Sequence, residues 1–166
     1  MDARADRVDD IIEAWRRELP EIVGPTTEMA KRITLLAAAL AKVTRRELNA
    51  FELTVAEYDV LVALRRTGSP YRLKPSHLVR ELLLSSGGTA KVLKQLADRR
   101  LVERHPDAED GRVAWVHLTA AGADLAERAV RATSAAQREL LRRLPPDVAE
   151  TATDVLQKVS AVVKEA

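Results

Sequence analysis

Apolar residues recur at every third or fourth position in several stretches of the chain, which is the spacing of one face of an α-helix. Residues 6–19 carry such a pattern, and the proline and glycine residues at positions 20, 24 and 25 end it. A longer pattern opens at Thr27 or Glu28, and its apolar positions are Met29, Ile33, Leu36, Leu40 and Val43. The spacing predicts a short amphipathic helix followed by a long one whose apolar stripe needs a partner surface.

The next helix has a clear start signal. Thr54 can cap it, and Glu57 three residues later can complete a capping box. We therefore expect a helix through about Arg66, ended by the Gly-Ser-Pro sequence at 68–70. Pro75 suits a first helical position, so Pro75–Leu82 is predicted to be a short helix.

Ser85 is a good N-cap for a helix that runs to about Arg100. At helical spacing Val92, Leu93 and Leu96 share one face, while Lys91, Lys94 and Asp98 lie on the opposite one. The glycines at 87 and 88 weaken the first turn by up to roughly 1 kcal/mol each relative to alanine. Such residues fit either a flexible turn or a place where the backbone approaches a phosphate closely.

Two short β-compatible runs follow, at residues 102–105 and 113–118, and a charged turn with an Asp-Gly pair separates them. Thr119 then caps a long helix, and Pro145 and Pro146 separate it from a last amphipathic helix. A cationic helix followed directly by a short, arginine-tipped hairpin is typical of a winged helix-turn-helix. The predicted fold is mainly α with a small β-hairpin wing: a module at 54–118 between helices at 1–53 and 119–166.

The composition is that of one Ala-, Leu- and Val-rich domain, with 46% hydrophobic and 3% aromatic residues. The apolar runs are too short to span a bilayer, and the acidic N-terminus does not resemble a secretory signal. We expect a soluble, cytoplasmic protein with no membrane partner. There is no cysteine, and the three histidines lack ligand spacing, so we expect neither a metal nor a cofactor.

Charge is unevenly distributed, although the net charge of the chain is only +2. Residues 70–118 hold nine Arg and Lys against six Asp and Glu, whereas residues 1–27 hold four against seven. The positive region coincides with the predicted helix and hairpin. It indicates either a nucleic-acid contact or a solvated charged face.

The apolar stripes at both ends of the chain exceed what the central module needs for its own core. A homodimer accounts for these surplus stripes. It presents two copies of the cationic helix, one from each chain, to successive major grooves of double-stranded DNA. The alternative is a larger monomeric bundle with the termini folded over the module.

Several short motifs together resemble the MarR family of ligand-responsive bacterial transcription regulators. They lie at residues 57–61, 75–88, 101–104, 110–112 and 118–122. The resemblance spans nearly the whole chain. It implies a homodimer with interlocked terminal helices, whose winged modules read a pseudo-palindromic operator.

The same resemblance assigns DNA-binding roles. The recognition-helix candidates are Ser85, Ser86, Thr89, Lys91, Lys94 and Gln95. Serine hydroxyls and backbone amides would bind phosphates, and lysine or glutamine would reach base edges. Arg112 would enter the minor groove from the wing tip, braced by Asp110.

Trp15, Asp59 and Arg104 match positions of the ligand pocket in the urate-responsive branch of that family. Lys91 stands where that branch has an arginine, and it lacks the planar fork that an arginine offers. The resemblance therefore implies a small aromatic anion as effector, bound between the N-terminal helix and the winged module. The alternatives are a packing anchor for Trp15, and a solvated or arginine-paired charge for Asp59.

The expected function is a ligand-responsive DNA-binding regulator, a repressor released from its operator by the anion. The chain lacks the HExxH, GxxxxGK[ST] and cysteine-nucleophile signatures, so we do not expect an enzyme. The alternative function is a helical protein-interaction module on a winged-helix scaffold.

Overall fold

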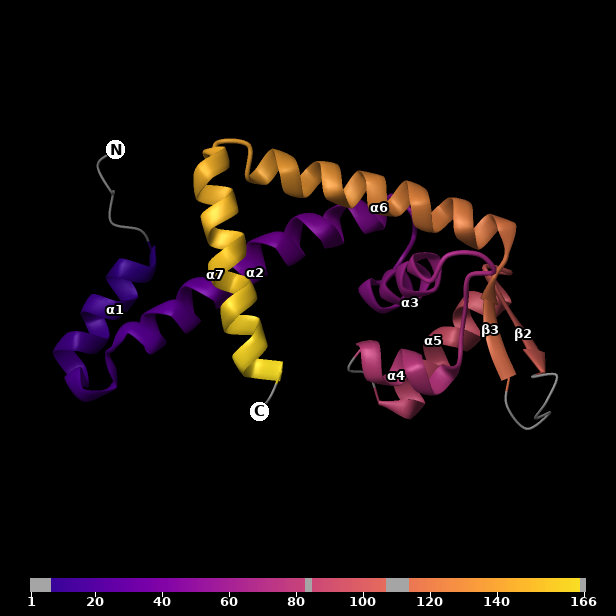
Figure 1. The fold of residues 1–166 in the computed structure, drawn as a ribbon, viewed down its shortest axis with the longest axis horizontal. Coiled ribbons are helices and arrows are strands. Elements are labelled where there is room, and N and C mark those ends of the chain that lie inside the picture. Colours follow the sequence, from indigo (N-terminus) through magenta and orange to yellow (C-terminus); the bar gives the residue numbers. More distant parts are fainter. Residues whose placement is uncertain (1–6, 83–84, 107–113, 165–166) are drawn as a thin grey trace.

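The computed structural model describes residues 7–82, 85–106 and 114–164. Its elements follow one another in a mainly helical chain (Figure 1). Their bounds are α1 Arg7–Glu18, η1 Pro20–Ile22, α2 Pro25–Asn49, α3 Val55–Arg66, β1 Arg72–Leu73, α4 Pro75–Leu82, α5 Ser86–Asp98, β2 Val102–Pro106, β3 Ala114–Leu118, α6 Ala120–Leu140 and α7 Pro146–Lys164.

The three helix starts predicted from caps are confirmed. Thr54 accepts a hydrogen bond from the Glu57 amide at 3.2 Å, and the Glu57 carboxylate accepts one from the Thr54 amide at 2.9 Å. Ser85 and Thr119 cap α5 and α6 through their side chains. Each cap satisfies an amide that the first helical turn leaves without an intrahelical partner.

The predicted start of α2 at Thr27 or Glu28 is wrong, because the helix begins at Pro25. Proline at the first helical position has no amide hydrogen to satisfy, and its fixed φ already suits a helix. Gly24 precedes it as an extended N-cap.

The wing belongs to a three-stranded antiparallel sheet with the order β1-β3-β2. Strand β1 was not predicted, because two residues are too few to show an alternating pattern. Gly122 at the start of α6 sits directly on the end of this sheet, where an added Cβ would lie 2.0 Å from the carbonyl oxygen of Leu101. Only glycine fits this junction.

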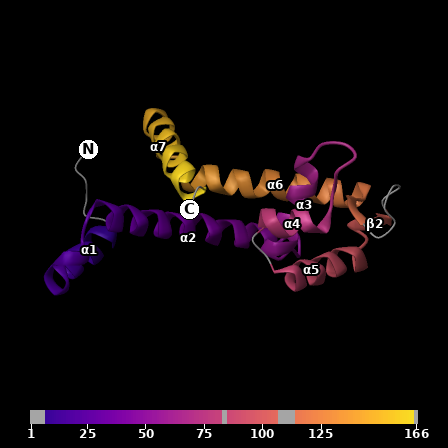
Figure 2. The ribbon, with the colours of Figure 1, turned by 60° about the horizontal axis from the view of Figure 1, so that its bottom comes forward.

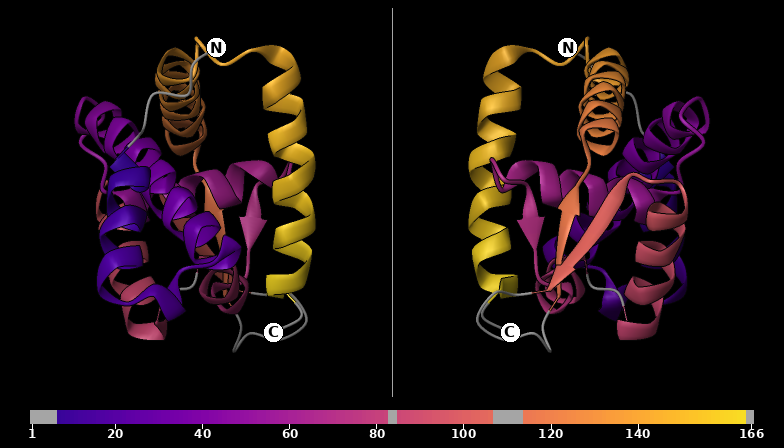
Figure 3. Two further views of the ribbon diagram at one scale, coloured as in Figure 1. Left: turned by 90° about the vertical axis from the view of Figure 1, so that its left-hand side faces the viewer. Right: turned by 90° about the vertical axis from the view of Figure 1, so that its right-hand side faces the viewer.

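The core lies within the module formed by α3, α4, α5 and the sheet, and α6 closes it from one side (Figure 2). Its fully buried larger side chains include Leu61, Leu64, Leu78, Leu93, Leu96 and Val116. Helices α2 and α6 pack against each other and lead away from this module. Helix α1 lies at the far end of α2, and α7 projects away from α6 (Figures 1 and 3).

Large apolar side chains stay exposed on these extended helices. They include Met29, Ile33 and Leu36 on α2, and Val148, Val155, Leu156, Val162 and Val163 on α7. The chain therefore leaves apolar surface uncovered at the end remote from its core. None of the helices within the described segments is both long and apolar enough to cross a bilayer.

Candidate nucleic-acid interface

Helices α4 and α5 form a helix-turn-helix in which α5 is half buried and half exposed. Val92, Leu93 and Leu96 face the core, as predicted. Lys91 and Lys94 lie on the solvent side, and Lys94 is 3.7 Å from the carboxylate of Asp98. Gln95 is also exposed. The outward face thus offers two ammonium groups and one amide on consecutive turns.

The start of α5 presents exposed backbone. The Ser85 hydroxyl oxygen accepts a hydrogen bond from the Gly88 amide at 3.0 Å, and both Ser85 and Ser86 are exposed. No atom lies within 4 Å of the point where a Cβ of Gly87 would be, so the backbone there is open to solvent. Open amides at a helix start favour an anionic partner.

Thr89 differs from the other recognition candidates, and the expectation that its side chain contacts DNA is wrong. The residue is only 1% exposed, and its hydroxyl donates to the carbonyl of Ser85 at 3.1 Å. Its position three, four and seven residues before Val92, Leu93 and Leu96 places it on the buried face of α5. Its side chain therefore stabilises the start of α5 from the buried face.

The other end of α5 is fixed by an arginine that the sequence did not single out. Arg99 donates to the carbonyl of Glu52 at 2.9 Å and to the carboxylate of Glu57 at 3.3 Å. Glu57 is 5% exposed, so this ion pair is shielded on one side from solvent. The contact ties the recognition helix to the capped start of α3 and positions it.

The wing contributes cations beside an aromatic ring. The Arg72 guanidinium lies 4.5 Å from the centroid of the Trp115 ring, and the Lys74 ammonium lies 4.9 Å from it. Cation–π contacts of this kind hold long basic side chains in place. The wing-tip candidates Asp110 and Arg112 lie outside the described residues.

The four predicted ligand residues are not brought together within one chain. Trp15 is on α1 at the far end of α2, whereas Asp59, Lys91 and Arg104 belong to the module at the other end (Figures 1 and 2). One chain alone therefore does not form the expected pocket between the N-terminal helix and the winged module, and that pocket stays a prediction. Burial raises the pKa of the half-buried Asp59 carboxyl above its usual value.

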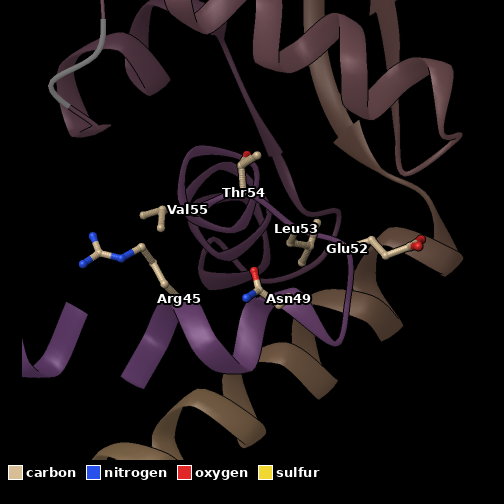
Figure 4. Close-up of a pocket in the computed structure, with 6 residues that line it drawn as sticks. All are labelled: Arg45, Asn49, Glu52, Leu53, Thr54 and Val55. Carbon is tan, nitrogen blue, oxygen red and sulfur yellow. The ribbon is translucent and has the colours of Figure 1, made fainter. Parts of the chain in front are cut away.

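Several hollows among the described residues have volumes that suit a small ligand, and two of them lie along α2. One, of about 450 Å³, lies between α1 and α2 and includes Trp15, Ile22 and Lys31 in its lining. The other, also about 450 Å³, lies where α2 meets α3 (Figure 4). Its lining residues are Arg45, Asn49, Glu52, Leu53, Thr54 and Val55, none of which was predicted to bind a ligand. Across residues 7–82, 85–106 and 114–164, no cluster of three or more His, Cys, Asp or Glu could hold a metal ion.

A helix-turn-helix with a cationic outer face, backed by a wing sheet, defines a winged-helix nucleic-acid-binding protein. Residues 51–113 match the model of the MarR family. The chain is also 27% identical over 139 residues to the HTH-type transcriptional regulator PecS of Dickeya dadantii (strain 3937), covering 84% of each sequence.

Solved structures agree on the fold. A mutant MarR from E. coli complexed with operator DNA superposes with a TM-score of 0.69 at 23% identity, covering 87% of this chain and 96% of that one. BpsR of Bordetella bronchiseptica, described with regulation of its DNA binding by 6-hydroxynicotinic acid, gives a TM-score of 0.68 at 22% identity over 80% of this chain and 98% of its own. The chain is therefore similar to the MarR family of transcriptional regulators over residues 51–113, and it shares the fold of solved members of that family.

Proposed function

We propose that the chain is a homodimeric repressor that occupies a pseudo-palindromic operator and leaves it when a small aromatic anion binds. The observation that carries the DNA-binding part is the outer face of α5. Lys91, Lys94 and Gln95 are exposed there, while the opposite face of the helix is fixed in the core. Cations on a rigid helix can neutralise phosphates or reach base edges without reorganising the protein.

The wing tip completes the proposed interface. Arg112 would enter a narrow minor groove, braced by Asp110, as the family resemblance implies. Arg112→Ala is expected to weaken operator binding by about 1–3 kcal/mol and to lower the salt dependence of binding. Unchanged affinity and salt dependence in a folded variant would exclude a wing contact.

The proposed dimer is supported by the uncovered apolar residues of α2 and α7. They lie at the end of the molecule opposite the sheet, so a partner docked on them leaves both modules free (Figure 1). A twofold dimer would place its half-sites about one helical turn apart, or roughly 10 base pairs centre to centre.

The proposed effector site requires that dimer. Trp15 of one protomer can join Asp59, Lys91 and Arg104 only if α1 reaches the module of the partner subunit. In that arrangement Arg104 and Lys91 would pair with the anion, and Trp15 would stack on its ring. Since Lys91 is on the recognition helix, a ligand that holds it competes with DNA, and ligand and operator must weaken each other by the same factor.

A paired substitution tests the DNA-binding face. Lys91→Ala with Lys94→Ala should lower the affinity for the operator at least tenfold and reduce the salt dependence. Lys42→Ala, an exposed lysine on α2, is the matched control and should leave both unchanged. Equal binding by the double variant and the control would rule out α5 as the contact surface.

Fluorescence tests the effector part. In a Trp115→Phe background, Trp15 is the sole tryptophan. Urate, xanthine, salicylate and 6-hydroxynicotinic acid are titrated while its emission and DNA binding are followed. We expect at least one to quench Trp15 and release DNA, and Arg104→Ala to abolish both effects. If no anion does either, the effector site is not at Trp15.

A further inference from the structure

One face of the wing sheet carries titratable groups that the proposed function has not used. The register pairs Glu103 and Arg72 with His117, and His105 with Trp115. Side chains alternate along a strand, and the neighbouring positions Val102 and Val116 are buried in the core. The paired residues therefore share the face of the sheet that is turned away from the core, here called the outer face.

Two imidazole rings touch on this outer face. The rings of His105 and His117 meet edge to face with their centroids 4.8 Å apart. The His105 Nε2 atom lies 3.2 Å from a carboxylate oxygen of Glu103. Among the described residues, the other charged groups here are Arg72 on β1 and Lys74 just after it, both over the Trp115 ring.

This arrangement disfavours protonation of His117 in the free protein. The pKa of His117 is lowered by burial, then by His105 and by Arg72, and Glu103 opposes these effects. A polyanion placed against the outer face would act in the opposite direction, because negative charge stabilises imidazolium. The His117 ring is thus poised to gain positive charge when an anion approaches.

The outer face is well placed to meet DNA. It lies at the end of the molecule opposite α1, on strands β2 and β3, and in the same module as α5 (Figure 1). It is also remote from α7, which carries uncovered apolar residues, so a partner docked on α7 leaves the sheet accessible (Figure 1). Its two fixed cations, Arg72 and Lys74, already favour phosphates.

We propose that the outer face of the wing sheet contacts DNA phosphates, and that His117, in contact with the His105 ring, takes up a proton when it does so. The proposal rests on the proposed function, since it needs a chain that binds DNA. It adds a second contact surface beside α5 and makes operator affinity dependent on pH. Each proton taken up strengthens binding by up to about tenfold for every pH unit by which the pH falls.

The test measures affinity and proton uptake together. Operator binding of the 166-residue chain is followed by calorimetry between pH 6 and 8, in buffers of different ionisation enthalpy. We expect affinity to rise several-fold per pH unit on acidification, with net proton uptake on binding. His105→Gln with His117→Gln should abolish the uptake, whereas His77→Gln on α4 is the matched control and should retain it.

A second variant separates charge from folding. His117→Arg supplies a permanent cation at the same position, so it should bind tightly at pH 8 and lose most of the pH dependence. Binding without proton uptake, or uptake that persists in the double glutamine variant, would overturn the proposal while leaving DNA binding intact. If neither the wild type nor any variant binds duplex DNA at any pH, the proposed function fails as well.

Discussion

At the scale of single residues, Glu57 joins three parts of the DNA-reading module. Its carboxylate accepts hydrogen bonds from the amide and the hydroxyl of Thr54 and from Arg99. The sequence predicted the first of these contacts, because a capping box is local and has a fixed spacing. The contact with Arg99 spans 42 residues, and no local pattern reveals it.

Removing this carboxylate should destabilise the fold. Glu57→Ala leaves the Thr54 amide without its partner and the Arg99 guanidinium without its counter-charge, so we expect a loss of about 2–4 kcal/mol in urea unfolding. Asp124→Ala is the control, because it breaks an exposed pair with Arg128 and should cost less than about 0.5 kcal/mol. Similar losses in the two variants would contradict the structural role of Glu57.

Replacing the carboxyl of Asp59 by an amide is expected to stabilise the protein. Burial raises the pKa of its carboxyl, so the folded state disfavours the ionised form that exists at neutral pH. Asp59→Asn should therefore raise Tm at pH 7. The Tm of the wild type should approach that of the variant as the pH falls towards 4, because the Asp59 carboxyl then becomes protonated. A lower Tm for the variant at pH 7 would show that the ionised carboxylate has a stabilising partner.

At the scale of elements, the helix starts that have a side-chain cap were predicted correctly, whereas the orientation of Thr89 was not. Caps at Thr54, Ser85 and Thr119 each identified a helix start correctly. Thr89 was assigned to the DNA face by family position, although its spacing from Val92 and Leu93 already placed it on the buried face. Hydrophobic periodicity was the more reliable guide here, because it reflects this chain's own packing.

Two glycine substitutions distinguish backbone exposure from backbone crowding. Gly87→Ala meets no atom and should stabilise the helix by about 0.5–1 kcal/mol, yet weaken operator binding several-fold if the amides approach a phosphate. Gly122→Ala forces a Cβ against the Leu101 carbonyl and should cost more than about 2 kcal/mol. Thermal unfolding measures the changes in stability, and fluorescence anisotropy measures operator binding. Full DNA affinity in Gly87→Ala would exclude close backbone approach.

At the scale of the whole molecule, the apolar pattern predicted surplus surface, and the structure shows where it lies. The exposed residues of α2 and α7 are grouped at the end opposite the wing. The sequence could not show that Trp15 lies far from Asp59 in the same chain, because relative placement of distant helices has no periodic signal. The proposed meeting of these residues between protomers stays a prediction.

Substitutions on α2 test the dimer. Ile33→Asp with Leu36→Asp places two charges on the exposed apolar stripe and should yield a monomer at micromolar concentration in light scattering. Ala38→Asp introduces the same side chain on the opposite, exposed side of α2 and should remain dimeric. A monomeric wild type would contradict the proposed assembly outright.

We propose that two copies of this chain bind one operator through cations of α5 and the wing. The most direct test of this proposal is a salt-titrated binding isotherm on duplex DNA from the chain's own upstream region. We predict two chains per duplex and a linear fall of log K with log salt concentration, with a slope of roughly −5 or steeper. Absence of binding at about 50 mM salt, or an affinity independent of salt, would contradict this mode of DNA binding.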